Sequence, residues 1–383
     1  MLAFSAHKLL APGGVLDDAR MLVEDGRIHA VGSKAGLAIP RCREVDFGNV
    51  LIAPGYIDLH IHGGAGHDVM DLTVDALPAI ERLLARHGVA SYFPTTVTAP
   101  IDATLRALDN LATAIESRQQ KREHGRASPL GIHLEGPFIS HARRGVHPAQ
   151  NLLPPTIQAF ERFWQAARGH IRMVTIAPEL GGVDEVIAEA ARRGICVSLG
   201  HSDADLASTQ RGIAAGARHA THTFNAMRPL NHRDPGILGA VLTDPRVSAD
   251  MIVDGIHLDP AIVRLVANAK GPENTVLITD ATAAAGMPDG TYHLGSFEVE
   301  VRDGRCMANG KLAGSVLTMD QAVRNLASFA DWSLPQAIAA ATRNPARVVA
   351  LNKGVLTAGA DADFVVLSRE GMVQRTFVGG EEC

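Results

Sequence analysis

The chain has 383 residues, 46% hydrophobic and 20% charged, an ordinary globular composition that excludes a disordered or fibrous protein. Its 36 Lys and Arg against 41 Asp and Glu give a formal charge of −5, which leaves no excess positive charge for a nucleic-acid backbone. No apolar run approaches the roughly 20 residues that span a bilayer, and the N-terminal segment lacks the apolar stretch of a secretion signal. We therefore expect a cytoplasmic globular protein that binds neither nucleic acid nor membrane.

Both ends of the chain predict short strands joined by turns. Asp25-Gly26 lies between two apolar runs, which is a strong hairpin signal. Neither end is long enough to bury a core alone, so we predict that residues 1–53 and 349–383 pair into one small β-sandwich domain. The expected strands cover residues 20–24, 27–32, 44–47, 363–367 and 374–378.

Residues 54–348 alternate apolar runs with amphipathic helical stretches such as 75–87, which is typical of parallel βα units. Eight strands are expected, so we predict an α/β fold, a (β/α)8 TIM barrel. Strand-like runs around Gly295-Ser296 interrupt the alternation of strands and helices and predict a hairpin insertion at about 288–305. The expected barrel strands cover residues 55–60, 91–96, 131–135, 172–176, 195–201, 219–222, 247–252 and 275–280.

Metal-binding residue types end several of these strands. Glu135 ends the third, His201 the fifth and His222 the sixth, and barrel active sites lie at the C-terminal ends of strands. His60 and His62 end the first strand, where residues two apart point to the same side. An isolated His-x-His is as often structural as ligating, but His201 and His222 end neighbouring strands and can share a cation. Imidazoles with a carboxylate and an open position predict a catalytic zinc-type site.

Asp280 ends the eighth expected strand. Its natural role is to take a proton from the attacking water and later give it to a leaving group. The alternative is a helix cap, because 279–283 also resembles a helix start. We favour catalysis because the metal candidates converge on the same rim.

Other polar residues fall in loops after the strands. An Arg, a His and backbone N–H groups together can hold a phosphate. Candidates are His147, Asn225, Arg233 and His257. Each alone is weak evidence, and the structural alternative for Arg233 is an ion pair with Asp234 or another carboxylate. We expect Arg143 and Arg144 to form a solvated surface pair, and His133 to support the site rather than to ligate.

At these residues the sequence resembles the amidohydrolase superfamily and, within it, the family of N-acetylglucosamine-6-phosphate deacetylases. His-Leu-Glu-Gly-Pro at 133–137 with Thr-His-x-x-Asn-Ala-Met at 221–227 is specific to the deacetylase branch, whereas His-x-His alone indicates only the superfamily. The resemblance covers essentially the whole chain. Its other segments are 53–63, 200–204, 254–257, 278–281, 312–315 and 359–363.

The resemblance implies a barrel with a β-sandwich made from both termini, assembled as a homodimer. Such an enzyme hydrolyses N-acetyl-D-glucosamine 6-phosphate to D-glucosamine 6-phosphate and acetate in amino-sugar catabolism. Carried over by position, Glu135, His201 and His222 hold the main divalent metal, with Zn²⁺ favoured and Fe²⁺ as an alternative. Asp280 is the general base and then the acid, and His147 helps to polarise the acetamide carbonyl.

The resemblance also assigns the substrate contacts and leaves the number of ions open. Some members have Gln and Asn at the first-strand pair and bind one metal, whereas others have two histidines and can bind two. This chain has His60 and His62, which allows one or two ions per subunit. Arg233 serves either its own site or the partner subunit's. The substrate-binding set is Val146, His147, Asn225, Ala226, Arg233, His257, Leu312, Ala313 and Gly314.

Two other functions compete with this hypothesis. One is another amidohydrolase, such as a cyclic-amide hydrolase or a deaminase. Many two-metal relatives bridge their ions with a lysine modified by carbon dioxide, whereas here Glu135 supplies a carboxylate and no expected strand ends in Lys. The other is a catalytically silent barrel that acts as a binding protein. Such a protein would be expected to lose ligands or the acid, and all are present.

Overall fold

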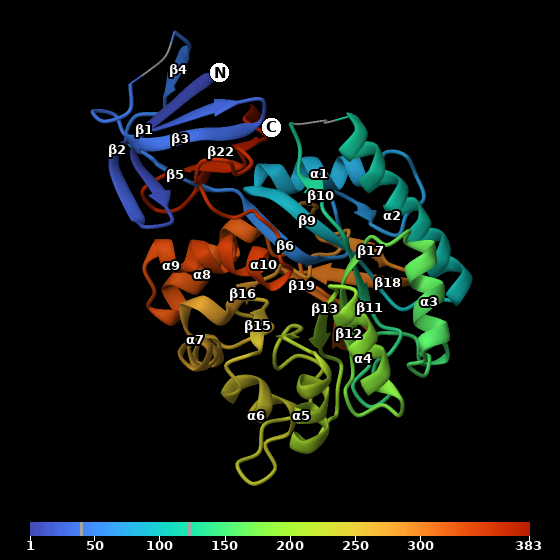
Figure 1. Cartoon of the computed structure of the whole chain (residues 1–383). Coiled ribbons are helices and arrows are strands. Elements are labelled where there is room, and N and C mark those ends of the chain that lie inside the picture. The colour runs from blue at the N-terminus through green and yellow to red at the C-terminus, as the bar shows by residue number, and fades with distance from the viewer. Residues whose placement is uncertain (39–40, 122–124) are drawn as a thin grey trace.

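Eight parallel strands lie side by side within the residues that the computed structural model describes, which are 1–38, 41–121 and 125–383 (Figure 1). Their order in the sheet follows the chain, as a barrel of βα units requires. Short β10 (Ser128–Pro129) also pairs with β9. The eight strands are β6 (Tyr56–Ile61), β9 (Val89–Thr96), β11 (Ile132–Glu135), β12 (Ile171–Ile176), β13 (Cys196–Leu199), β14 (His219–Ala220), β15 (Ser248–Met251) and β16 (Thr275–Leu277).

Helices follow the strands along the chain and cover the outside of the barrel (Figure 1). In α1 the side chains of Leu77, Ile80, Leu83 and Leu84 are buried, and this spacing puts them on one helix face. None of the helices among the described residues is both long and apolar enough to cross a membrane. The helices are α1 (Ala76–Arg86), α2 (Ile101–Lys121), α3 (Ile157–Ala166), α4 (Val183–Arg192), α5 (Leu206–Ala215), α6 (Gly236–Thr243), α7 (Pro260–Asn274), α8 (Met319–Ala330), α9 (Leu334–Ala340) and α10 (Arg343–Val348).

The barrel closes between its first and last strands through backbone contacts just beyond β16. The His62 N–H donates to the Ala281 carbonyl at 2.8 Å, and the Asp280 N–H donates to the His60 carbonyl at 2.9 Å. Closure therefore places Asp280 beside the two histidines of the first strand.

Strands from both ends of the chain share a second sheet, which carries an apolar cluster separate from that of the barrel. β5 (Leu51–Pro54) lies between β1 (Leu2–Ala11), to which it is parallel, and β21 (Phe364–Leu367), to which it is antiparallel. Phe4, Phe364 and Phe377 pack against one another in this cluster. The remaining strands of the sheet are β2 (Gly14–Glu24), β3 (Arg27–Ser33), β4 (Arg43–Asp46), β22 (Val373–Val378) and β23 (Glu381–Glu382).

The insertion after the eighth barrel strand is larger than the predicted hairpin at 288–305. β17 (Gly290–Leu294) and β18 (Phe297–Arg302) form that hairpin, and β19 (Arg305–Ala308) and β20 (Lys311–Leu312) extend it into a four-stranded antiparallel sheet. A two-stranded ribbon of β7 (Gly63–Gly64) and β8 (His67–Asp68) follows the first barrel strand. Asp68, on β8, contacts the turn between β17 and β18, because its Oδ2 accepts the Gly295 N–H at 2.7 Å.

The fold class predicted from the sequence, a TIM barrel with a sheet domain built from both termini, is confirmed. The domain division at residues 1–53, 54–348 and 349–383 stays a prediction.

Candidate metal centre

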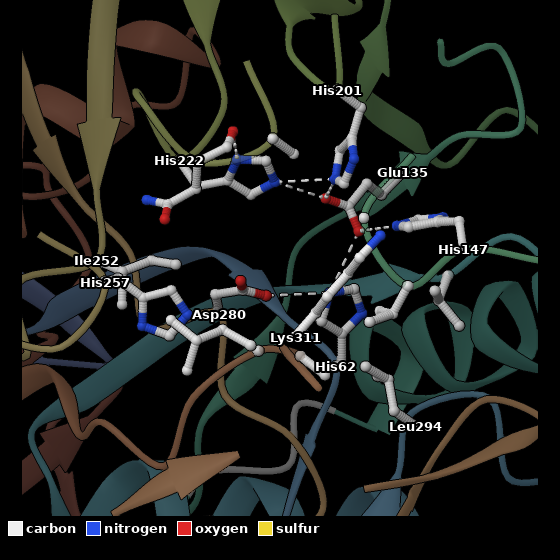
Figure 2. A pocket seen from close by; sticks show the side chains of 18 of the residues that line it. His62, Glu135, His147, His201, His222, Ile252, His257, Asp280, Leu294 and Lys311 are labelled. Atoms are coloured by element: carbon white, nitrogen blue, oxygen red, sulfur yellow. Dashed lines mark hydrogen bonds and ion pairs between the residues drawn. The ribbon is translucent and has the colours of Figure 1, made fainter. Parts of the chain in front are cut away.

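The residues predicted to surround a cation meet at one end of the barrel, in a cavity of about 300 Å³ (Figure 2). Glu135 is the last residue of β11. His201, His222 and Asp280 lie just beyond the ends of β13, β14 and β16, whereas the sequence analysis placed them within these strands. The backbone there turns into the left-handed region, with φ of +47°, +31° and +50°. That conformation costs a non-glycine residue about 1–2 kcal/mol, and such strain is typical of functional sites.

Glu135, His201 and His222 form a tight triangle. Glu135 Oε1 lies 3.2 Å from His201 Nε2 and 3.1 Å from His222 Nε2, and the two nitrogens are 3.0 Å apart. Ligand atoms bound about 2.1 Å from a tetrahedral ion are separated by about 3.4 Å, so the triangle is close to the size that such an ion requires.

A second group lies on the other side of the same carboxylate. His60 Nε2 and His62 Nε2 are 3.1 Å apart, and Asp280 Oδ1 is 3.1 Å from His62 Nε2 and 3.5 Å from His60 Nε2. Glu135 reaches both groups, because its two oxygens lie 3.4 Å from His60 Nε2 and 3.3 Å from His62 Nε2. The arrangement fits two neighbouring cation positions that share Glu135.

Hydrogen bonds to the outer ring nitrogens decide which histidines offer a lone pair to the cavity. Nδ1 of His62, His201 and His222 lies 3.0–3.1 Å from the backbone carbonyls of Thr95, Arg143 and Asn225, respectively. A carbonyl only accepts, so each Nδ1 carries a hydrogen, and in the neutral ring each Nε2 is left with the lone pair that a metal ligand needs. His60 differs, since its buried Nδ1 finds no hydrogen-bond partner within the described part of the chain.

The protonation preferences of the cluster show how strongly it attracts positive charge. Burial opposes a charge on Glu135, but the neighbouring His60 and hydrogen bonds from His147, His201 and His222 hold its pKa well below the usual value. Burial likewise opposes a charge on Asp280, and His60 and His62 lower its pKa to about 2.

The imidazoles respond in opposite directions. Burial lowers the pKa of His201 to about 4. Burial also opposes a charge on His222, but the hydrogen bond to Glu135 and the negative charges of Glu135, Asp280 and Asp250 together raise its pKa to about 9. Two ionised carboxylates thus lie in a buried site that draws protons onto nearby imidazoles. A divalent cation satisfies the same demand, and the donor set of the cluster fits it.

The predicted substrate-binding residues divide into those that line the cavity and one that does not. Arg233 lies outside, in the rim loop formed by residues 229–234, all of which are exposed. The ion pair considered between Arg233 and Asp234 is absent from the described contacts, and Arg228 pairs with Asp234 instead. The lining residues from the predicted set are Val146, His147, Asn225, Ala226, His257, Leu312, Ala313 and Gly314.

Two arginines expected to form a surface pair behave differently from each other. Arg143 lines the cavity and donates to Asp203 at 2.7 Å, whereas half-buried Arg144 donates to the His141 carbonyl. His133 lies beneath the cluster, with Nδ1 3.1 Å from the Leu59 carbonyl, and is not among the lining residues.

Three features of the site escaped the sequence analysis. Lys311, on β20, lines the cavity, and its side chain crosses in front of His62 in Figure 2. Asp254 holds His257, because its Oδ2 lies 2.7 Å from His257 Nδ1 while Oδ1 accepts the His257 N–H at 2.8 Å. Leu294, on β17, also faces the cavity. Asp254 was detectable, since it belongs to the quoted 254–257 motif, whereas Lys311 and Leu294 lie outside every quoted motif.

Comparison with known proteins agrees with this geometry. Residues 51–383 match the amidohydrolase family. The chain belongs to the amidohydrolase family. It is 39% identical over 384 residues to N-acetylglucosamine-6-phosphate deacetylase from Bos taurus, covering 96% of this chain and 89% of that one. It is also 38% identical over 379 residues to N-acetylgalactosamine-6-phosphate deacetylase from Escherichia coli O157:H7, covering 98% and 97%.

Solved structures of the same group of enzymes are also similar to this amidohydrolase. It superposes with a TM-score of 0.93, at 35% identity, on a mutant N-acetyl-D-glucosamine-6-phosphate deacetylase from Mycobacterium smegmatis in complex with N-acetyl-D-glucosamine-6-phosphate. The match covers 100% of this chain and 98% of that one. The resemblance seen in the sequence motifs is therefore confirmed.

Proposed function

We propose that the chain is a metal-dependent hydrolase that removes the acetyl group from N-acetyl-D-glucosamine 6-phosphate, giving D-glucosamine 6-phosphate and acetate in amino-sugar catabolism. The observation that carries this proposal is the contact of Asp280 with a cluster in which Glu135 meets two pairs of imidazoles. Such a cluster supplies both a cation site and an acid–base group to one cavity. Curated relatives of the same branch carry out deacetylation of phosphorylated amino sugars.

Glu135, His201 and His222 hold the main divalent ion, with Zn²⁺ as the favoured identity because the donors are imidazole and carboxylate. When bound, the ion lowers the pKa of the attacking water and stabilises negative charge on the carbonyl oxygen. His60 and His62, with Asp280 beside them, provide room for a second ion.

Asp280 moves the proton. Its carboxylate is ionised at neutral pH, because its pKa lies at about 2. It takes a proton from the attacking water and delivers it to the sugar nitrogen, which becomes a leaving group only when protonated. His147, 3.5 Å from Glu135 Oε2, donates to the acetamide oxygen.

The phosphate supplies binding energy remote from the reacting amide, which orients the acetamide in the cavity. Asn225, Ala226 and His257 hold the phosphate at one side of the cavity, and Val146 with residues 312–314 contacts the sugar. Arg233 lies outside the cavity of its own chain, which favours a homodimer in which it serves the partner subunit's site. We place the enzyme in the cytoplasm, where phosphorylated sugars are available.

Metal analysis combined with an acetate-release assay tests this function. The protein as purified is assayed on N-acetylglucosamine 6-phosphate, on its unphosphorylated form and on N-acetylgalactosamine 6-phosphate, the C4 epimer that the Escherichia coli relative's name indicates. We expect at least one tightly bound divalent ion per chain and the highest kcat/KM on N-acetylglucosamine 6-phosphate. Full activity after the ion is removed would refute the proposal, and preference for the epimer would change the substrate but not the reaction.

A further inference from the structure

His147 differs from the other cavity histidines in the hydrogen bonds of its outer nitrogen. Its Nδ1 lies 2.8 Å from Thr98 Oγ1 and 3.3 Å from the Thr98 backbone nitrogen. Both residues are only 3% exposed. The other nitrogen, Nε2, lies 3.5 Å from Glu135 Oε2, and Figure 2 shows the ring pointing at that carboxylate.

These contacts determine where the ring carries its hydrogen. A backbone N–H can only donate, so Nδ1 of His147 must be an acceptor, and the Thr98 hydroxyl donates to the same nitrogen. In the neutral ring the hydrogen then lies on Nε2, which faces the cavity. His62, His201 and His222 have the opposite arrangement, because carbonyls accept from their Nδ1. At the nitrogen that faces the cavity, His147 is therefore a hydrogen-bond donor, whereas the other three rings offer lone pairs.

The backbone around Thr98 is built for this close contact. Thr98 lies between the end of β9 and the start of α2, and its hydroxyl packs against Gly136, immediately after Glu135. A Cβ on Gly136 would lie 2.3 Å from Thr98 Oγ1, and the φ of +72° at this position also favours glycine. Gly136 therefore leaves room for the hydroxyl that holds His147.

We propose that Thr98 is a positioning residue that fixes His147 as the Nε2–H tautomer, so that the ring donates to the substrate's carbonyl oxygen and does not ligate the cation. The inference rests on the proposed function, since it needs an amide carbonyl in the cavity. A donor aimed at developing negative charge stabilises the transition state more than the ground state. Thr98 thus acts on kcat, through His147, without touching substrate.

The test compares Thr98→Val, which keeps the branched shape but removes the hydroxyl, with Thr98→Ser, which keeps the hydroxyl. We expect Thr98→Val to lower kcat on N-acetylglucosamine 6-phosphate by about 10-fold, with KM and metal content unchanged. This is less than the loss of about 100-fold or more that follows removal of a whole oxyanion donor, because His147 itself remains. Thr98→Ser should stay within about 2-fold of the unmodified enzyme. Thr96→Val is the matched control, because Thr96 is buried nearby and its Oγ1 has no hydrogen-bond partner among the described residues. It should leave kcat unchanged.

A double-mutant cycle separates positioning from simple packing. In a His147→Gln background, Thr98→Val should cause no further loss of kcat, because the ring that it positions is gone. A full 10-fold loss in that background, or normal kcat in Thr98→Val alone, would overturn the proposal. These outcomes differ from failure of the proposed function, in which the unmodified enzyme itself would release no acetate.

Discussion

The buried cluster of candidate metal ligands and the exposed rim loop 229–234 differ in how their side chains are held in place. In the cluster, five histidines and two carboxylates contact one another within one chain, and most of their outer nitrogens are held by backbone or hydroxyl groups. In the rim loop, Arg233 is exposed and lies outside the cavity. The difference teaches that folding of one chain brings the candidate metal ligands and Asp280 together, whereas on the proposed function Arg233 must reach the phosphate from outside the cavity of its own chain.

The largest expected effect on kcat comes from substitution of Asp280, which belongs to the buried cluster. Asp280→Asn keeps the shape of the side chain but cannot take a proton, so kcat should fall by about 1,000-fold or more. The main ion, measured by elemental analysis, should be retained because Glu135, His201 and His222 remain. Near-normal turnover would remove Asp280 from the acid–base role.

The two halves of the cluster should respond unequally to loss of a ligand. His222→Asn should remove the main ion and lower kcat by about 100-fold or more, as expected for a metal that activates water. His60→Asn should retain one ion per chain and lose less activity, because among the described residues His60 Nδ1 has no orienting hydrogen bond like that of His222 Nδ1. Equal metal loss in both variants would contradict the division into two positions.

A substitution in the rim loop should have a smaller effect, and only on the phosphorylated substrate. Arg233→Ala should raise KM for the phosphorylated sugar by about 10- to 100-fold, the usual cost of a lost charge-assisted hydrogen bond. KM for the unphosphorylated sugar should not change. Arg211→Ala, which removes an exposed arginine on α5, is the control.

Mixed dimers decide which subunit Arg233 serves. A dimer of one Arg233→Ala chain and one Asp280→Asn chain contains one intact acid and one intact arginine. If Arg233 reaches the partner subunit's site, this mixture regains activity at low substrate concentration. If the mixture is no better than the Arg233→Ala parent, Arg233 serves its own chain.

The smallest effect is expected at Asp254, which holds His257 at the side of the cavity where we propose that the phosphate binds. Burial opposes its charge, but hydrogen bonds from the His257 ring and from backbone N–H groups hold the pKa of Asp254 below its usual value. Asp254→Asn weakens that hold and should raise KM for the phosphorylated sugar by roughly 3- to 10-fold, corresponding to about 1 kcal/mol. A fall in kcat with unchanged KM would instead connect Asp254 to the chemical step.

The sequence predicted the barrel and the candidate ligands because both depend on a repeating local pattern. Apolar runs that end in His, Glu or Asp place these residues at one rim of a parallel barrel, and Glu135 with His201 and His222 meets there. The left-handed turns after the strands were missed, since non-glycine residues rarely adopt them. Lys311 and Thr98 were missed because their places depend on how an insertion and a loop pack, which no period in the sequence records.

The sheet built from both ends of the chain constrains the order in which the protein folds during synthesis. β5 needs β1 on one side and β21 on the other, so one of its edges stays unpaired until residues 364–367 leave the ribosome. An open strand edge is a template for pairing with other chains. The barrel strands, all encoded between β5 and β21, emerge before β21. A chain that stops between the barrel and β21 therefore has an open edge on β5, although its candidate metal ligands and Asp280 have already been translated.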